Sequence, residues 1–198
     1  MKQFLLMIML ALPLSVYAQS ETEEKNQTTF EKFTSTIGHI VKFKDYTLPD
    51  ITGKDGSGLL AVYYIVHAQI RQVMVGDDTS LFLRLSYKPD QTTPTRYAFI
   101  AYEDVLEINK ALKELVDQGS VDTTGDANYL ENKFKTQDYF DIGYYIRKYV
   151  SKKGEESFTK KWYIDLDNRL NNSTAFFATP NDLVNLFGNA INKMESLK

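Results

Sequence analysis

Three short segments of this chain occur twice in the same order, about 80 residues apart. Self-similarity at a fixed spacing indicates repeated structural units, so this feature limits the possible folds more than any other. The matched pairs are Tyr63-Tyr64-Ile65 with Tyr144-Tyr145-Ile146, 81–85 with 162–166, and 98–101 with 175–178. The first two pairs share a displacement of 81 positions, and the third fits after a shorter loop. We therefore expect a duplicated chain whose halves are related by a pseudo-twofold axis.

Each half contains several stretches rich in β-branched and aromatic residues, followed by one stretch with helical periodicity. The predicted strands of the first half are 39–43, 59–67, 70–75, 81–88 and 96–101, and those of the second are 129–135, 140–150, 158–166 and 174–178. We predict an α+β fold of two tandem β-rich units, each closed by a C-terminal helix. The sheet is expected to be mainly antiparallel, with both helices on one face.

The two predicted helices have apolar residues at three- and four-residue spacing and recognisable ends. The first covers 103–117 and is expected to stop at Gly119. The second begins near Pro180, where Thr179 is expected to cap the helix and Asp182 to reach back to the backbone. Their apolar stripes predict that both helices are buried against a sheet.

The first 18 residues have the pattern of a secretory signal peptide, with Lys2, an apolar run over 4–14 and a small residue at Ala18. The run is shorter than the roughly 20 residues that a membrane-spanning helix needs. We expect cleavage of 1–18, which makes the mature protein periplasmic or secreted. The remaining boundaries are expected to be a polar tail over 19–29, a first repeat over 30–117, a connection over 118–127 and a second repeat over 128–198.

Charge and cysteine content limit the partners. The chain has a net charge of −3 and no cysteine. A mildly acidic chain is unsuited to nucleic acid or to an anionic membrane surface, so we expect neither partner and no stable membrane insertion after cleavage. A bacterial lipoprotein needs a cysteine at its cleavage site, so lipid attachment is not expected. Stability without disulfides must come from a packed core. The oligomeric state stays open.

No cluster of residues has the pattern of a recognised catalytic, cofactor or metal site. His39 and His67 lie far apart in the sequence, and the glycine-rich segment 53–58 lacks the helix start of a phosphate loop. Glu103 and Asp104 fit the first turn of a helix, where acidic side chains complement the macrodipole. We therefore predict no catalytic residue, no metal and no cofactor. A hydrolase whose acids come together only on folding is the alternative.

Alternation along the second half predicts a sheet face rich in aromatic and basic side chains. Such a face can stack sugar rings or dock a peptide, because tyrosine combines a flat apolar ring with a hydrogen-bonding hydroxyl. An ordinary solvated face is the other interpretation. The candidate ligand-binding residues are Tyr145, Arg147, Tyr149, Lys161 and Tyr163, with Arg84 at the corresponding position of the first half.

The order of Tyr129-Leu130-Glu131-Asn132-Lys133, Gly143-Tyr144-Tyr145 and Lys161-Trp162-Tyr163 is similar to that of uncharacterised exported proteins of Gram-negative bacteria. This resemblance brings no activity and no site residue. The residue patterns lead us to expect a non-enzymatic, exported binding protein. Its partner is expected to be a glycan, a peptide or another envelope protein.

Overall fold

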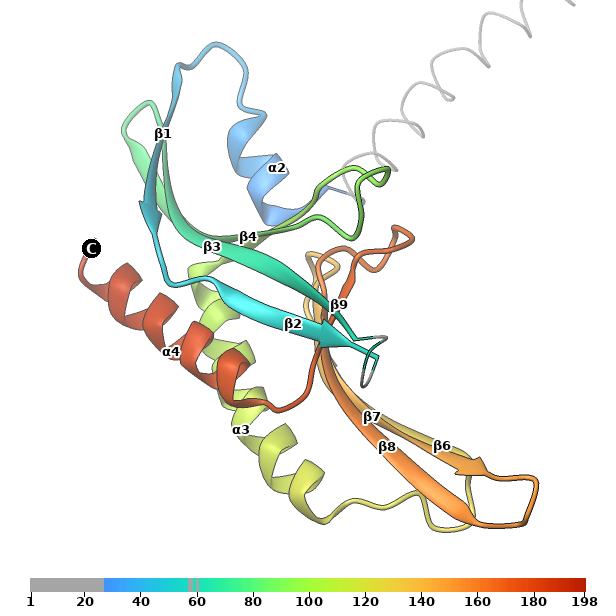
Figure 1. Ribbon diagram of the computed structural model, residues 1–198. Helices are drawn as coiled ribbons and strands as arrows, with labels where there is room; N and C mark the ends of the chain where they lie inside the picture. The colour runs from blue at the N-terminus through green and yellow to red at the C-terminus, as the bar shows by residue number, and fades with distance from the viewer. Residues whose placement is uncertain (1–26, 57–58, 60) are drawn as a thin grey trace, which may run out of the picture.

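The computed structural model describes residues 27–56, 59 and 61–198. The predicted signal peptide and most of the predicted tail lie outside the described residues. The described part forms three helices and nine strands in two antiparallel sheets (Figure 1). This confirms a mixed fold that consists mostly of strands. None of the helices in the described part is long and apolar enough to cross a membrane.

The first sheet contains β1 (Val41–Thr47), β2 (Ile51–Asp55), β3 (Val62–Val75), β4 (Asp78–Tyr87) and β5 (Arg96–Ala101). All neighbours are antiparallel, and β1 and β2 follow one another along the same edge of β3. Pro49 lies between β1 and β2, and proline has no backbone N–H to give to a neighbouring strand. The edge of this sheet is therefore one strand with a single interruption.

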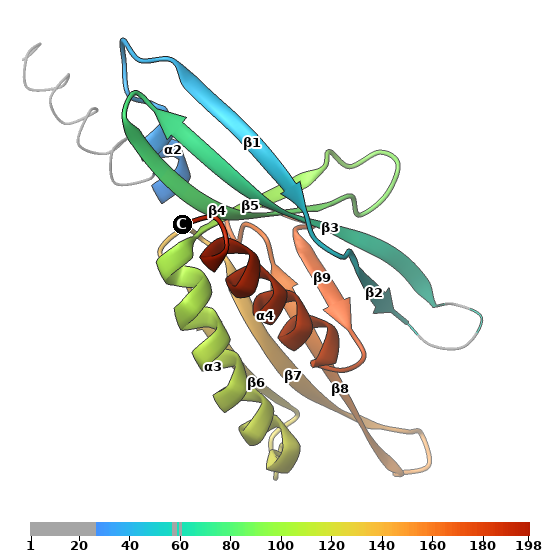
Figure 2. The same ribbon diagram turned by 90° about the vertical axis from the view of Figure 1, so that its left-hand side faces the viewer.

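The second sheet consists of β6 (Tyr129–Lys135), β7 (Asp141–Val150), β8 (Glu156–Asp165) and β9 (Thr174–Phe177). Helix α3 (Tyr102–Val121) links the sheets, and α4 (Asn181–Glu195) follows the second one. The two helices lie side by side (Figure 2), α3 contacts strands of both sheets, and α4 reaches β2 and β3. Phe187 of α4 also meets Phe140 beside β7, with ring centroids 6.2 Å apart. Each helix therefore serves both sheets rather than closing only its own half.

One hydrophobic core lies between the two sheets and these two helices. Alternate residues of the strands point into it, and Phe140, Tyr144 and Phe187 are fully buried there. Helix α2 (Thr29–Thr34) lies on the other face of the first sheet (Figure 1), where Phe30 and Phe33 complete a smaller cluster. Helices thus occupy both faces of the first sheet, whereas the sequence predicted only one helix-covered face.

The strands of the first half differ from the prediction at β2 and β3. β3 is continuous through 68–69, where a break between two strands was predicted, because β1 and β4 pair with it along both edges there. β2 was not predicted as a strand, since Gly53 lowered its apparent β character. The Tyr64 ring occupies the space that a Cβ at Gly53 would need, so the glycine permits this close packing.

Gly119 lies inside α3, which continues to Val121, so the predicted stop at this glycine is wrong. A Cβ at Gly119 would lie 2.9 Å from the Trp162 ring and 3.2 Å from the Tyr144 ring. The glycine therefore lets both rings pack closely against the helix rather than ending it. As a consequence, the first residues of the predicted connection 118–127 are helical.

The helix caps also differ from the prediction. Helix α4 begins at Asn181, and no side chain bonds to its first amides, so Thr179 is not its cap. Thr28, assigned to the tail over 19–29, caps α2: its Oγ1 accepts a hydrogen bond from Glu31 N at 3.2 Å. The Glu31 side chain in turn accepts one from Thr28 N at 2.7 Å, which completes a capping box. The tail prediction is therefore wrong for its last two residues.

Four antiparallel strand positions followed by one helix occur in each half, but the strand registers do not preserve the displacement of 81. In the registers of β3 with β4 and of β7 with β8, a displacement of 81 for the second strand corresponds to 72 for the first. The odd difference inverts the two faces, so Tyr63 is 63% exposed whereas Tyr144 is 0% exposed. The Tyr-Tyr-Ile segments therefore do not occupy equivalent positions.

Candidate functional site

The expected aromatic and basic face lies on the second sheet, on the side away from the core. Residues opposite one another in neighbouring strands share a face, and the register places Tyr145 between Glu131 and Lys161. Tyr163 in turn lies opposite Phe176. We call this surface the outer face of the second sheet, and it consists of Tyr129, Glu131, Tyr145, Arg147, Tyr149, Lys161, Tyr163 and Phe176.

Tyr145 is at the centre of four aromatic rings on this face. Its ring centroid lies 5.8 Å from that of Tyr129, 6.5 Å from that of Tyr163 and 6.2 Å from that of Phe176. Tyr129 and Phe176 were not among the predicted residues, because their position depends on how β6 and β9 are registered. Alternation within 129–135 was the one available signal for Tyr129. The fold thus builds a larger aromatic surface than the sequence indicated.

Arg147 lies beside two of these rings. Its guanidinium carbon is 5.9 Å from the Tyr129 ring centroid and 5.8 Å from that of Tyr145, within range of a cation–π interaction. The side chain is exposed, and no carboxylate of the described residues forms an ion pair with it. The neighbouring cations are engaged, since Lys148 bonds to Glu156 at 2.5 Å. Arg147 therefore presents a guanidinium without an internal acidic partner.

Lys161 and Tyr163 are held by other residues of the protein. Lys161 forms an ion pair with Asp55 of β2, and this hydrogen bond lowers the pKa of the Asp55 carboxyl. Burial opposes the charge on Lys161, but the pair with Asp55 outweighs burial and raises the pKa of Lys161. Tyr163 is 6% exposed, and its hydroxyl donates to Glu131 Oε1 at 2.5 Å. Burial, followed by this bond, raises the pKa of Tyr163. Both side chains position the face rather than offering a free group to a ligand.

The remaining two candidates lie away from the aromatic centre. Tyr149 is 48% exposed and is located towards the end of the β7–β8 hairpin. Arg84 belongs to β4, on the first sheet, where Nη1 donates to Gln69 Oε1 at 2.5 Å and the guanidinium carbon lies 4.9 Å from the Tyr97 centroid. Arg84 was placed with the others through the displacement of 81, which the strand registers do not preserve. The structure does not bring it to the outer face of the second sheet.

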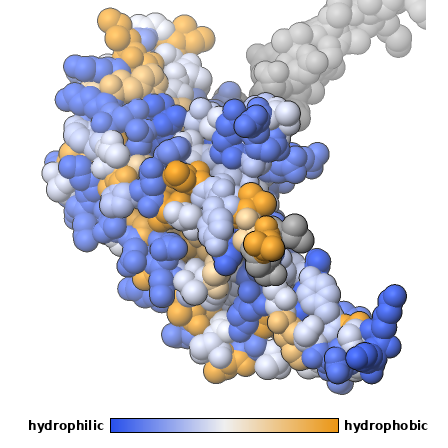
Figure 3. Space-filling model, in the orientation of Figure 1, coloured by the Kyte–Doolittle hydropathy of each residue, from blue (hydrophilic) through white to orange (hydrophobic). Residues whose placement is uncertain are grey.

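The β2–β3 ribbon closes the free edge of β9. The Tyr64 hydroxyl donates to the backbone oxygen of Phe176 at 2.9 Å and accepts a hydrogen bond from the backbone nitrogen of the same residue. Burial raises the pKa of Tyr64, which keeps its donating proton in place. One side chain therefore satisfies both backbone groups of an edge residue, which is a way of blocking pairing with another chain. Figure 3 shows apolar atoms over this ribbon and hydrophilic atoms at the end of the β7–β8 hairpin.

Acidic groups with altered titration lie elsewhere. The pKa of Asp104 is raised to about 6, mainly by burial and then by the charge of Asp138. Asp104 lines neither the pocket beside α2 nor the one beside the C-terminus. His67 Nδ1 lies 2.9 Å from Asp50 Oδ2 on an exposed surface. Within the described ranges, no three histidine, aspartate or glutamate side chains are grouped so that they could hold a metal ion.

Comparison of the chain with protein-family models, with curated proteins and with solved structures gives no match. The function is therefore argued from the geometry of the outer face of the second sheet.

Proposed function

We propose that this protein is an exported, non-enzymatic binding protein that holds an acidic glycan on the outer face of the second sheet. The observation that carries this proposal is Arg147, an exposed guanidinium beside the rings of Tyr129 and Tyr145 with no ion-pair partner in the described part of the chain. A guanidinium matches the geometry of a carboxylate, and a neighbouring tyrosine ring covers the apolar side of a sugar. The two chemistries together fit a sugar that bears a carboxylate.

The shape of the surface favours an extended ligand. Neither described pocket is lined by the residues around Tyr145, so the ligand contacts an open face. A chain of sugar rings gains affinity by covering such a face, whereas peptide recognition by strand addition uses a sheet edge and separate side-chain pockets. The edge at β9 is already closed by Tyr64.

The proposal is tested by calorimetric titration with two probes of equal length, an oligosaccharide of galacturonic acid and the uncharged galactose oligosaccharide. We expect Arg147→Ala to weaken binding of the acidic probe at least tenfold and to remove the preference over the uncharged one. Lys152→Ala is the control, because it removes the same charge from the exposed hairpin turn. Equal losses in both variants would reduce the effect to net charge and contradict a site at Arg147.

We also propose that the two halves are copies of one unit of four strand positions and a helix. The shared order of elements supports this, as does the presence of aromatic and basic residues on the outer face of both sheets. Because the strand registers differ, the copies have diverged in how their strands are aligned.

A hydrolase with acids assembled by the fold is the second candidate, and the raised pKa of Asp104 favours it. Prolonged incubation of the same acidic oligosaccharide with the protein at pH 6, followed by product analysis, tests this candidate. Cleavage that is lost in Asp104→Asn would favour the hydrolase, and an intact oligosaccharide would leave the binding protein.

A further inference from the structure

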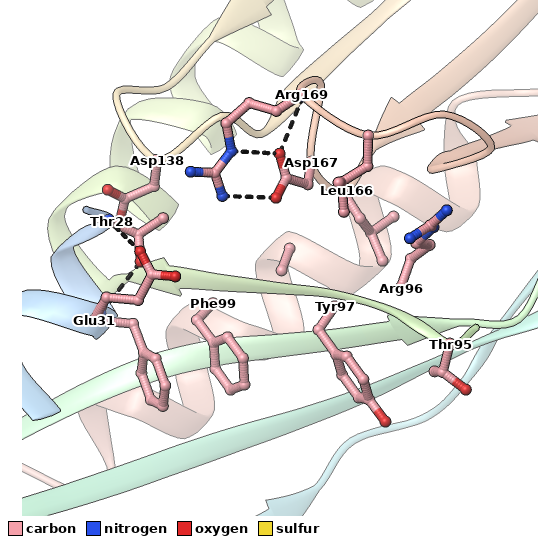
Figure 4. A pocket seen from close by; sticks show the side chains of 13 residues that line it. Thr28, Glu31, Thr95, Arg96, Tyr97, Phe99, Asp138, Leu166, Asp167 and Arg169 are labelled. Carbon is pink, nitrogen blue, oxygen red and sulfur yellow. Dashed lines mark hydrogen bonds and ion pairs between the residues drawn. The ribbon is translucent and has the colours of Figure 1, made fainter. Parts of the chain in front are cut away.

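A pocket of about 280 Å³ lies where α2, β5 and the segment after β8 meet (Figure 4). None of its lining residues belongs to the outer face of the second sheet, so it is a separate place on the molecule. Its floor is a row of three rings. The Phe30 and Phe99 centroids are 3.9 Å apart with planes 10° from parallel, and the Phe99 and Tyr97 centroids are 6.4 Å apart.

Asp138 lies at one end of this row (Figure 4) and is 8% exposed. Its Oδ1 accepts hydrogen bonds from the backbone nitrogen and the hydroxyl of Thr29, at 2.8 and 3.0 Å. Its Oδ2 is buried and has no hydrogen-bond partner among the described residues. A carboxylate oxygen that has lost water without gaining a donor is destabilising, and a ligand that supplies a donor relieves this.

Arg96 lies at the other end of the row (Figure 4). Its Nη2 donates to the backbone oxygen of Asn171 at 2.7 Å, while its Nε is buried and, within the described part of the chain, unpartnered. The other arginine of the pocket, Arg169, is held by Asp167 through two hydrogen bonds of 2.8 and 2.7 Å. The pocket therefore has one unsatisfied acceptor and one unsatisfied donor at opposite ends, with apolar rings between them.

We propose that this pocket binds a short peptide with free termini and an aromatic side chain. The terminal ammonium meets Asp138 Oδ2, the terminal carboxylate meets the Arg96 guanidinium, and the side chain packs on the rings of Phe99 and Tyr97. Charge complementarity selects an amphoteric ligand. A free amino acid carries both charges on one carbon and cannot reach both ends, whereas two or three residues extend about 7 to 10 Å. A pocket of this volume is at the lower limit for ligand sites, which restricts the peptide to that length.

Calorimetric titration of the purified protein with the dipeptide alanyl-phenylalanine tests the proposal, alongside its N-acetylated form and its C-terminal amide. We expect each blocked form to bind at least tenfold more weakly than the free dipeptide. Asp138→Asn should abolish the discrimination against the N-acetylated form alone, and Arg96→Gln the discrimination against the amide alone. This crossed pattern depends on one charge at each end, and general loosening of α2 does not produce it.

Thr29→Val is the control for loosening of α2, because it removes the hydroxyl bond to Asp138 Oδ1 and leaves Oδ2 and its charge in place. We expect this variant to keep both preferences. Circular dichroism establishes that each variant is folded before titration. The absence of binding, equal affinity for free and blocked dipeptides, or the same loss for all three probes in Asp138→Asn and Arg96→Gln would each overturn the proposal.

Discussion

The outer faces of the two sheets contain similar residues but differ in how they are covered. On the first sheet, α2 places Phe30 against Phe82 and Phe99, and Asp45 holds Arg71 at 2.7 Å. On the second sheet, no helix of the described part covers the rings, and Tyr129 is 45% exposed. Composition alone therefore does not make a sheet face available to a ligand. A short helix and one ion pair turn the first face into part of the packed interior.

The comparison is sharpened most strongly by Phe82→Ala. Phe82 is fully buried between the first sheet and α2, with its ring 5.2 Å from that of Phe30. Truncating such a ring removes about 3–5 kcal/mol from the free energy of unfolding, because a cavity remains. Urea denaturation measures the loss. A loss below about 1 kcal/mol would mean that α2 does not seal the first face, since surface substitutions have effects of that size.

Tyr64→Phe tests whether the first half closes the edge of the second sheet. The variant leaves the backbone nitrogen and oxygen of Phe176 without their shared hydroxyl, and unsatisfied groups of this kind cost about 1–3 kcal/mol. Tyr63→Phe is the matched control, since Tyr63 is its exposed neighbour on the opposite face of β3. Equal unfolding free energies for the two variants would contradict the role given to the Tyr64 hydroxyl.

Asp104 predicts a pH dependence at the junction near α2. Its pKa is raised to about 6, by burial first and then by the charges of Asp138, Glu107 and Glu103. A carboxyl with a raised pKa stabilises the folded state at low pH, and this contribution is lost as pH rises from about 4 through 6. We expect Asp104→Asn to be more stable than the natural protein at pH 8 and to show a smaller loss across this window.

Thermal unfolding between pH 4 and 8 measures this effect. Asp117→Asn provides the control, because Asp117 is exposed on the same helix several turns away. An unchanged slope in Asp104→Asn would show that the pH dependence comes from other acids.

The smallest expected effect on stability is that of Tyr145→Ala. Tyr145 is half-buried on the open face, so we expect a loss of about 1 kcal/mol or less and cooperative unfolding. Binding of the acidic oligosaccharide should nevertheless weaken, as in Arg147→Ala. A variant that unfolds as readily as Phe82→Ala would place Tyr145 in the structural framework and remove the contrast between the two faces.

The strands of the second half were largely predictable from the sequence. β6 occupies 129–135 as expected, and the other three strands lie within two residues of the prediction, because regular alternation and short turns define hairpins locally. β3 was not predictable in the same way. Its 14 residues pair with β1, β2 and β4, and these distant partners, rather than local propensity, keep it extended.

The candidate site was predictable only in part. Alternation placed Tyr145 and Arg147 on one face, but their neighbours Tyr129 and Phe176 depend on strand register. Arg84 was misplaced because sequence displacement does not determine that register. The pocket beside α2 combines segments far apart in the chain, as the bonds from Thr29 to Asp138 illustrate, and no local pattern marks it.

The most direct test of the central claim is an NMR titration of the protein with the galacturonic acid oligosaccharide, with resonances followed on both sheets. The account predicts shifts at Tyr129, Tyr145 and Arg147 that saturate together, with Arg84 and Phe99 unaffected. Shifts confined to the first sheet, or no saturable shift on the second, would contradict the assignment of the outer face of the second sheet as the binding surface.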